Sequence, residues 1–473
     1  MASVSSVVVA SFSTYRRSAG HEGLSVRQSL ATDPTRSPTG YLWPLGAVVL
    51  LYAIELLLRV QRLHNKNLSV GHVHDVLYLG AIIAIGLLEA VALLALRTSL
   101  PPRPRAFFPW AIAAFVIMVA LSLLSPDTEV IGSPDAYAYV GYAKLPAFSQ
   151  AYAPPKYPFT GPGFEAIYKS WGNPIVPADY GPLWLFFDRL TLSRAASMQQ
   201  ALLVMRTLNI AFLILLLVAL RRLLLPNPVL VLVALNPMIL YYYIVEAHND
   251  IGAILLVVVG MVIARKQPWL GAIVAGAAGL TKVTFAFIAS AALGRRNLPV
   301  ALAQSAIVVA VTVFGSALFG GPNYVHVMIG TGRWMVYGGG HGISMGASDA
   351  VYITGLVLHA CVALIAIAAL IASQCGRFIA PAAYSFSGIA PTLYPHYLGW
   401  CIPYALRTPK AAATFFATLP AIAPLIVYPA GPWGVLADLY FLAIIALFAR
   451  HLLRTKSGLA SLRRKLKADA QGS

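Results

Sequence analysis

Residues 241–250, YYYIVEAHND, lie where one apolar run of the chain ends and the next begins. Four polar side chains stand at this junction: Glu246, His248, Asn249 and Asp250. Ionisable groups beside apolar runs are costly to bury, and they mark functional sites by default. Glu246 and Asp250 are four residues apart, so they share a face if the helix is continuous. The group is therefore predicted to bind substrate, and the alternative is a role in helix packing.

Around this junction, the solvent for most of the chain is lipid. Of 473 residues, 59% are hydrophobic and 11% are charged, far from the composition of soluble domains. Lipid cannot satisfy backbone N–H and C=O groups, and the apolar runs are long rather than alternating, so the spans are predicted to be helices. The sequence predicts an all-α, polytopic membrane protein of about 11 to 13 transmembrane helices. Spans are expected near residues 41–60, 76–96, 107–125, 199–220, 227–245, 247–264, 298–319, 349–373, 378–394, 398–406, 411–428 and 433–450.

The net charge of +18 does not indicate nucleic-acid binding. Lys and Arg residues form short clusters between apolar runs, as in cytoplasmic loops under the positive-inside rule. The three cysteines lack metal-ligand spacing and predict neither a disulfide framework nor a zinc site. The chain is divided into a flexible cytoplasmic leader (1–40), an extra N-terminal transmembrane pair (41–100), a transmembrane core (106–450) and a basic cytoplasmic tail (451–473). Both termini are thus expected in the cytoplasm.

One segment conflicts with a single membrane crossing. Paired basic residues stand at both of its ends, at 265–266 and 295–296. A straight helix over the intervening residues would be about 42 Å long, which exceeds a hydrocarbon core of about 30 Å. Two half-length helices in a hairpin fit both facts, with the turn near Gly279, Thr281 and Lys282.

Three basic residues, Arg59, Arg62 and Lys66, contradict the positive-inside rule. With the N-terminus in the cytoplasm, they fall on the external side of the membrane. They follow the first predicted span. The topology of the N-terminal pair is therefore the part that the charge pattern supports least.

The longest polar segment, residues 126–182, is predicted to be an ordered external loop because it is rich in acidic, Pro, Gly and Tyr residues. Asp135 stands near its start, and Tyr139 and Tyr180 lie within it. A carboxylate at the membrane surface suits removal of a proton from a sugar hydroxyl, and tyrosines offer stacking faces to the ring. The alternative for Asp135 is a helix cap after Pro134. Asp179, by itself, is interpreted as a solvated loop acid.

Three cations are candidates for binding a phosphate: Arg206, Lys282 and Arg333. Arginine offers paired donors and lysine a point charge. Arg206 lies several residues into a predicted span, and its alternative role is snorkelling toward the headgroups. Lys282 at the hairpin turn lacks that alternative. Arg333 is predicted to lie in an external loop.

Two further stretches of the sequence contain histidines. His396 lies in YPHYLGW (394–400), which is either an interfacial aromatic belt or a site histidine. His72 and His74 lack a third ligand in the sequence and are interpreted as loop residues. The sequence indicates no metal ligand and no cofactor, and it leaves a requirement for a metal open.

Five stretches in order carry a resemblance: DAYAYVGYAKL (135–145), NPIVPADYGPLW (173–184), LNPMILYYYIVEAHND (235–250), GLTKVTF (279–285) and YPHYLGW. From about residue 106 to 450 the chain resembles the GT-C superfamily of integral-membrane glycosyltransferases. It is most similar to the polyprenol-phosphate-mannose-dependent mannosyltransferases of actinobacterial cell envelopes, including the glycosyltransferase-87-like group. Relatives often have His-Pro-Trp-Tyr where this chain has YPHY, and some carry an acidic pair that this loop lacks.

The resemblance implies an inverting transfer of a hexose from a polyprenyl-phosphate donor to a glycolipid or glycan acceptor, on the external face of the plasma membrane. It implies that Asp135 is the catalytic base and that Lys282 and Arg206 bind the donor phosphate. His248 and Asp250 are then expected to line the same cavity.

Two other classes of function stay open on the sequence. A polytopic transporter of solutes or lipid-linked sugars also buries charges, although no internal repeat is visible in the residue pattern. A non-catalytic lipid-binding protein has the same architecture if it descends from an enzyme, because fold does not fix function.

Overall fold

The computed structural model describes residues 40–66, 72–100, 107–125, 135–293, 298–337, 395–406 and 409–426. Among these residues every regular element is a helix, which confirms the predicted all-α class. The elements are α2 (Leu42–Lys66), α3 (His72–Ser99), α4 (Phe108–Leu124), α5 (Asp135–Lys144), η1 (Phe148–Tyr152), α6 (Glu165–Trp171), α7 (Pro182–Leu192), α8 (Met198–Arg222), α9 (Asn227–Ala234), α10 (Pro237–Leu240), η2 (Tyr241–Val245), α11 (Asp250–Ala264), α12 (Pro268–Ala277), α13 (Phe285–Leu293), α14 (Leu298–Tyr337), η3 (Pro395–Tyr404) and α17 (Pro409–Ile426).

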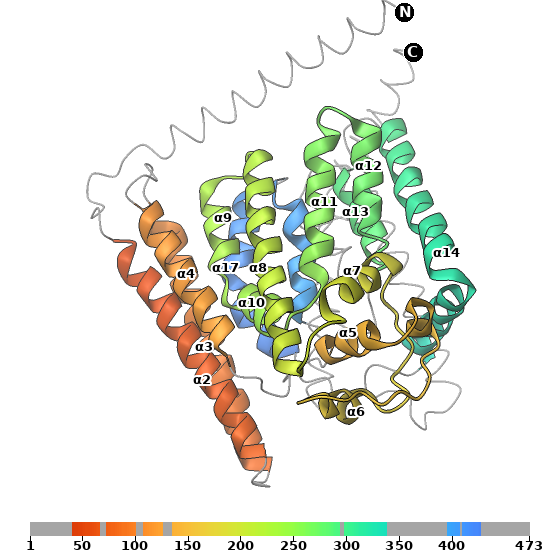
Figure 1. Cartoon of the computed structure of the whole chain (residues 1–473). Helices are drawn as coiled ribbons and strands as arrows, with labels where there is room; N and C mark the ends of the chain where they lie inside the picture. The colour runs from red at the N-terminus through yellow and green to blue at the C-terminus, as the bar shows by residue number, and fades with distance from the viewer. Residues whose placement is uncertain are drawn as a thin grey trace, which may run out of the picture.

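The described helices form a polytopic membrane bundle. Four of them are long and apolar enough to cross a membrane, and a bent pair makes a fifth candidate. Helices α2, α3 and α4 lie on one side, α8 to α11 and α17 in the middle, and α12 and α14 on the other side (Figure 1). The short helices α5, α6 and α7 gather toward one end. The leader, the tail and the spans predicted at 349–373, 378–394 and 433–450 lie outside the described residues.

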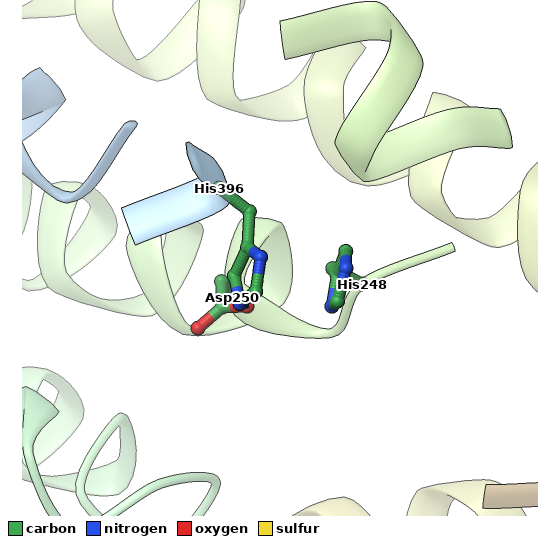
Figure 2. A group of neighbouring side chains, drawn as sticks. All are labelled: His248, Asp250 and His396. Carbon is green, nitrogen blue, oxygen red and sulfur yellow. The ribbon is translucent and has the colours of Figure 1, made fainter. Parts of the chain in front are cut away.

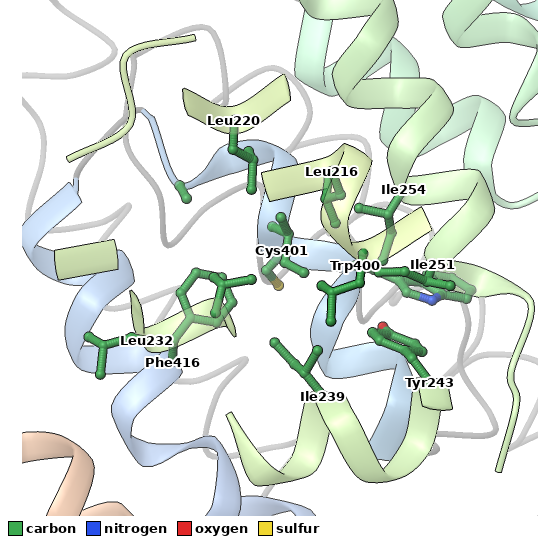
Figure 3. Close-up of a cluster of buried hydrophobic side chains, with 14 of the residues drawn as sticks. Leu216, Leu220, Leu232, Ile239, Tyr243, Ile251, Ile254, Trp400, Cys401 and Phe416 are labelled. Atoms are coloured by element: carbon green, nitrogen blue, oxygen red, sulfur yellow. The ribbon is translucent and has the colours of Figure 1, made fainter. Parts of the chain in front are cut away.

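A buried apolar cluster joins the middle helices to η3. Trp400 and Cys401 of η3 are fully buried beside Tyr243 and Ile251 (Figure 3). Because η3 is a 3-10 helix of ten residues, the span predicted at 398–406 is wrong. Instead, this segment packs against the protein core next to the junction at residues 241–250.

One predicted span is bent, and another continues as a longer helix. The span expected at 227–245 bends by 49° between α9 and the helix that follows it. At the bend, the amide of Asn236 donates to the carbonyl of Phe416 at 2.7 Å, and its side-chain oxygen accepts from the N–H of Ile239. Helix α14 extends well past residue 319 with a kink at Gly321, where φ is +68°. Arg333 therefore lies in this helix and not in a loop.

The hairpin predicted from the paired basic residues is present. Helices α12 and α13 are only 10 and 9 residues long, and the turn between them holds Thr281 and Lys282. The segment before α7 attaches to this turn, because the N–H of Gly181 donates to the carbonyl of Thr281 and that of Leu183 to the carbonyl of Leu280, both at 2.9 Å. The polar segment and the hairpin are thus held together.

Gly181→Ala should destabilise the protein because the added Cβ would lie 2.1 Å from the carbonyl oxygen of Leu280. Overpacking of this kind costs about 1–3 kcal/mol. Gly46→Ala in α2 is the matched control, since nothing lies within 4 Å of its added Cβ. Thermal unfolding in detergent should show a lower Tm for Gly181→Ala alone. Equal Tm values for the two variants would contradict the close approach.

Arg59 lies in a helix and not in the loop in which it was expected. Helix α2 continues to Lys66, so Arg59 lies inside a helix and is only 7% exposed. Its guanidinium pairs with Glu55 one turn earlier, with Nε 2.9 Å from the carboxylate. This residue is therefore part of the bundle and not an exception among loop charges.

Candidate active site

The polar junction is shaped by an unusual stretch of backbone. Tyr241–Val245 forms a π-helical turn, a feature found often at functional sites. Ala247 follows with φ +56°, a conformation that costs a non-glycine residue of the order of 1 kcal/mol. The amide of Asn209 in α8 holds this turn, donating to the carbonyl of Tyr243 at 2.6 Å and of His248 at 3.0 Å. The helix between Glu246 and Asp250 is therefore not continuous.

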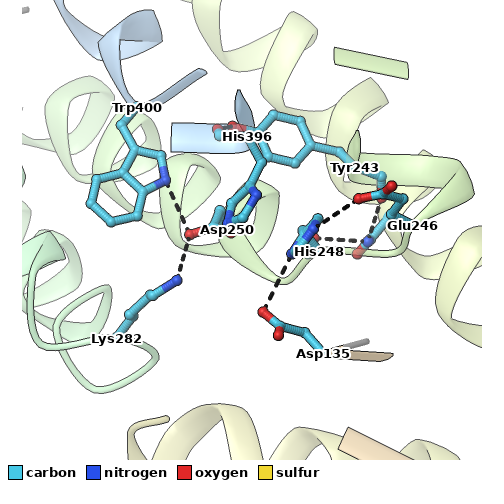
Figure 4. A network of polar contacts seen from close by, with 9 residues as sticks. Asp135, Tyr243, Glu246, His248, Asp250, Lys282, His396 and Trp400 are labelled. Carbon is cyan, nitrogen blue, oxygen red and sulfur yellow. Dashed lines mark hydrogen bonds and ion pairs between the residues drawn. The ribbon is translucent and has the colours of Figure 1, made fainter. Parts of the chain in front are cut away.

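Asp135, His248 and Glu246 form a line of contacts (Figure 4). One ring nitrogen of His248, Nδ1, lies 3.6 Å from Oδ2 of Asp135, and the other, Nε2, lies 3.2 Å from Oε2 of Glu246. The His248 side chain is fully buried, whereas that of Asp135 keeps 15% of its surface exposed. Asp135 is the first residue of α5, so the helix start presents its carboxylate to the junction.

Lys282 and Asp250 form a second buried contact. Nζ of Lys282 lies 3.3 Å from Oδ1 of Asp250, and the indole N–H of Trp400 donates to the same oxygen at 3.0 Å. The ammonium group also lies 4.8 Å from the ring centre of Tyr397 and 5.9 Å from that of Tyr180, within the range of cation–π attraction. The hairpin thus delivers a cation to the polar junction, as its sequence predicts.

His396 joins the same cluster from η3. Its ring stacks on that of His248, with centres 3.7 Å apart and planes 18° from parallel. The hydroxyl of Tyr243 donates to the His396 carbonyl at 2.6 Å, which fixes the backbone there. The His396 side chain is 3% exposed. Of the two interpretations from the sequence, burial at the junction favours the site histidine over the interfacial belt.

A metal ion does not fit this cluster as it is arranged. His248, Asp250 and His396 each offer one ligand atom, all within 4.8 Å of one another (Figure 2). However, both ring nitrogens of His248 face carboxylates, and Oδ1 of Asp250 already accepts from two donors, which leaves its Oδ2, 3.8 Å from Nε2 of His396. Lone pairs lie in the plane of an imidazole, so two stacked rings do not direct them to one point about 2.0 Å from each, as zinc requires.

Asn249 has buried polar atoms that nothing in the described structure satisfies. The residue is 1% exposed, and neither its side-chain nitrogen nor its oxygen has a hydrogen-bond partner among the described residues. A buried amide without partners costs roughly 1–3 kcal/mol. Such a cost is expected where a ligand supplies the missing partners, so the geometry supports the substrate-binding role predicted for Asn249.

Tyr139 and Tyr180 are packed beside the cluster. Their ring centres lie 4.8 Å apart, edge to face, and Trp184 lies 5.7 Å from Tyr139. Tyr139 is fully buried and Tyr180 is 6% exposed. Lys282 lies near the Tyr180 ring, and contact of the two rings with substrate remains a prediction.

The other two predicted phosphate ligands are placed differently from Lys282. Arg206 is 5% exposed and donates to the carbonyls of Val245 at 3.1 Å and Ser125 at 2.7 Å. These bonds hold the end of the π-helical turn, which favours a supporting role over the predicted contact with phosphate. Arg333 lies in the distal part of α14, and its side chain is outside the described part of the structure.

Asp179 was missed as a site residue on the sequence. Burial raises its pKa to about 6; the positive charge of Lys282 opposes this rise and the carboxylate of Asp135 adds to it. Asp179 therefore belongs to the same electrostatic cluster and is not an isolated loop acid. The attachment of the preceding loop to the hairpin through Gly181 brings it there, and no local pattern reveals that attachment.

The protonation of His248 makes stability depend on pH. Burial alone lowers its pKa, but the contacts with Asp135 and Glu246 more than offset this and raise the pKa to about 9. A raised pKa stabilises the fold fully below the unfolded value of about 6.5, and this stabilisation is lost as the pH rises through the folded value. The Tm should therefore fall between about pH 6.5 and 9.

The measurement is a thermal scan across this window with wild type and His248→Gln. The variant should lose less stability over the same pH interval because it has no imidazole to deprotonate. Parallel pH profiles for the two proteins would show that His248 carries no such charge.

Taken together, the fold and the cluster define an all-helical membrane protein with a buried acid–base site. The chain belongs to the MptA_B family, described as alpha-(1->6)-mannopyranosyltransferase, N-terminal domain, which matches residues 58–296. No curated protein and no solved structure matches the chain. The match supports a glycosyltransferase of mannosyltransferase type, and it includes Asp135, His248 and Lys282. It does not reach η3, and the glycosyltransferase-87-like assignment stays a prediction.

Proposed function

We propose that this protein transfers mannose from a polyprenyl-phosphate-linked donor to a hydroxyl of a glycolipid or glycan, with inversion at the anomeric carbon and Asp135 as the general base. One observation carries the proposal: the partly exposed carboxylate of Asp135 meets the buried ring of His248 at 3.6 Å, in a cluster that also holds Lys282. An acid–base group and a cation side by side suit an acceptor hydroxyl and a leaving phosphate.

In this mechanism Asp135 removes the proton from the acceptor hydroxyl. The hydroxyl oxygen forms a bond to the anomeric carbon while the bond from that carbon to the phosphate oxygen breaks. The electron pair of the broken bond leaves with the polyprenyl phosphate, and the proton stays on Asp135. Attack from the side opposite the phosphate inverts the anomeric carbon.

His248 and Glu246 act on Asp135 rather than on the sugar. A protonated His248 beside Asp135 keeps the carboxylate ionised and fixes its direction, and Glu246 holds the second ring nitrogen. His396 stacks on the His248 ring and limits its movement. A general base needs such orientation because proton transfer requires hydrogen-bond reach.

Lys282 is the cation that the proposal assigns to the leaving phosphate. Asp250 and Trp400 position the lysine at the tip of the hairpin, and its side chain keeps 13% of its surface exposed. A fixed cation in a buried, low-dielectric site stabilises developing negative charge more than it does in water. Asn249 is assigned to the sugar hydroxyls because its buried amide lacks partners in the described structure.

The external face is proposed from the distribution of charge. Basic residues lie at the far end of the bundle from the site: Arg265, after the end of α11, donates to the carbonyls of Arg222 and Leu223. Asp250 begins the same helix at the site end. The positive-inside rule then puts the basic end in the cytoplasm and the site outside. Family membership favours this enzyme over the transporter.

The stereochemistry of the donor tests the proposal. If the product has the alpha linkage of the family description, an inverting enzyme must consume a donor with the beta configuration. Purified protein in lipid should therefore use beta-linked polyprenyl-phosphate mannose and leave the alpha-linked isomer unreacted. NMR of the product gives its anomeric configuration. Transfer from the alpha-linked donor to an alpha product would contradict the single inversion at Asp135.

A further inference from the structure

Arg59 in α2 is a buried charge that the proposed mechanism does not use. It lies in the N-terminal helix pair, more than 70 residues before Asp135 in the chain. Its guanidinium carbon lies 3.8 Å from the ring centre of Tyr241, which is a close cation–π contact. Glu55 holds the guanidinium from the same helix. A buried arginine costs much free energy unless it is paired in this way, so its position needs an explanation.

Tyr241 begins the π-helical turn that shapes the site. The carbonyl of Tyr241 accepts the N–H of Glu246 at 3.0 Å, and the carbonyl of Tyr242 accepts the N–H of His248 at 3.2 Å. The rings of the two tyrosines pack edge to face with centres 5.1 Å apart. A shift of the Tyr241 ring would therefore move the backbone that carries Glu246 and His248.

We propose that Arg59 is a positioning residue for the transfer reaction, because it clamps the Tyr241 ring and thereby fixes the line formed by Glu246, His248 and Asp135. On this proposal, which rests on the proposed function, the N-terminal helix pair is part of the active site and not an accessory. Arg206 and Asn209 hold the turn from α8. Arg59 holds it from α2, so the turn is fixed between two helices.

The charge of Arg59 also reaches Glu246. Burial raises the pKa of Glu246, and its hydrogen bond with His248 and the positive charges of His248 and Arg59 oppose that rise. Interaction with the Tyr241 side chain also lowers the pKa of Glu246. Loss of Arg59 should therefore weaken the hydrogen bond between Glu246 and the His248 ring. It should also make the π-helical turn less rigid.

The test compares kcat for two variants. Arg59→Met alone leaves Glu55 buried without its partner and invites misfolding, so the test variant is Glu55→Gln with Arg59→Met. The matched control is Arg221→Met in α8, which removes an exposed guanidinium that lies 5.8 Å from the ring centre of Phe108 and leaves no buried charge unpaired. The double variant should lose about tenfold to 10²-fold in kcat with little change in KM, as expected for a displaced catalytic group. The control should stay near wild type.

A double-mutant cycle checks the route through the ring. Tyr241→Leu removes the aromatic ring that the Arg59 guanidinium contacts. If Arg59 acts through this ring, kcat for Tyr241→Leu in the Glu55→Gln, Arg59→Met background should be nearly the same as without it. Multiplied losses, or an unchanged kcat in the double variant, would overturn the proposal.

The NMR spectrum of the His248 ring tests the inference without a measurement of mannosyl transfer. The ¹⁵N signals of the His248 ring, assigned by comparison with His248→Gln, should shift in the Glu55→Gln, Arg59→Met variant and match wild type in Arg221→Met. Unshifted signals would contradict positioning through Tyr241 whether or not the protein transfers mannose. Absence of transfer by wild type would count against the proposed function instead.

Discussion

Asp135→Asn should reduce mannosyl transfer by about 10² to 10⁴-fold, the usual contribution of a general base. Asparagine has nearly the same shape but cannot accept the proton of the acceptor hydroxyl. The first turn of α5 should keep its structure because the side chain remains polar and 15% of its surface is exposed. The measurement is the single-turnover rate with bound donor and excess acceptor, which isolates the chemical step from product release.

Glu165→Gln is the matched control for this substitution. Glu165 is also the first residue of a helix, α6, in the same polar segment, but it is exposed and has no contact with the cluster. The control should retain wild-type rates and the same Tm. A rate for Asp135→Asn within a few-fold of wild type would remove Asp135 from the mechanism.

Lys282→Met should weaken donor binding by about ten- to a hundredfold, because a charge-assisted hydrogen bond to phosphate contributes about 1.5–3 kcal/mol. The same substitution leaves Asp250 buried beside Trp400 without its cation. Breaking a buried ion pair costs about 3–5 kcal/mol. The single variant therefore mixes loss of binding with loss of stability.

A charge-balanced variant separates the two effects. Lys282→Met with Asp250→Asn removes both charges and should recover most of the lost Tm. Its affinity for the donor, measured by titration with polyprenyl-phosphate mannose, should stay low. Lys282→Arg keeps the positive charge and should bind the donor better than Lys282→Met or the charge-balanced variant. Wild-type donor affinity in the charge-balanced variant would exclude Lys282 from the phosphate site.

Hydropathy and charge predict the spans well where a helix is straight. Helix α8 occupies Met198–Arg222, close to the span expected at 199–220. The hairpin of α12 and α13 was also predicted from the sequence, because paired basic residues at both ends of the segment conflict with a single crossing. Both predictions use the length of a segment and the positions of its charged residues, which can be read directly from the sequence.

Bends are not visible in hydropathy. The break at Asn236 depends on its bond to Phe416, 180 residues away. The predicted span ended at residue 319, before Gly321 and Pro322, whereas α14 continues through the kink to Tyr337, so Arg333 lies in a helix and not in the expected loop. Hydropathy shows neither the direction of a bend nor whether the helix continues beyond it.

The candidate site is likewise predictable from the sequence only in part. The junction at residues 241–250 is recognisable because polar groups interrupt apolar runs. Its pairing with Asp135 and His396 joins segments more than 100 residues apart. Arg59 was interpreted as a loop charge, although Glu55 four residues earlier has the spacing of a helical ion pair. Its contact with the ring of Tyr241 joins distant segments and is not visible in the sequence.

The most direct test of the central claim is transfer of label by purified protein in lipid, with either polyprenyl-phosphate [¹⁴C]mannose or GDP-[¹⁴C]mannose as donor and a membrane lipid extract as acceptor. The proposed mechanism predicts that label reaches a new product only from the lipid-linked donor, with one polyprenyl phosphate released per mannose and almost none with Asp135→Asn. Transfer from the nucleotide donor, or equal transfer by wild type and Asp135→Asn, would contradict it.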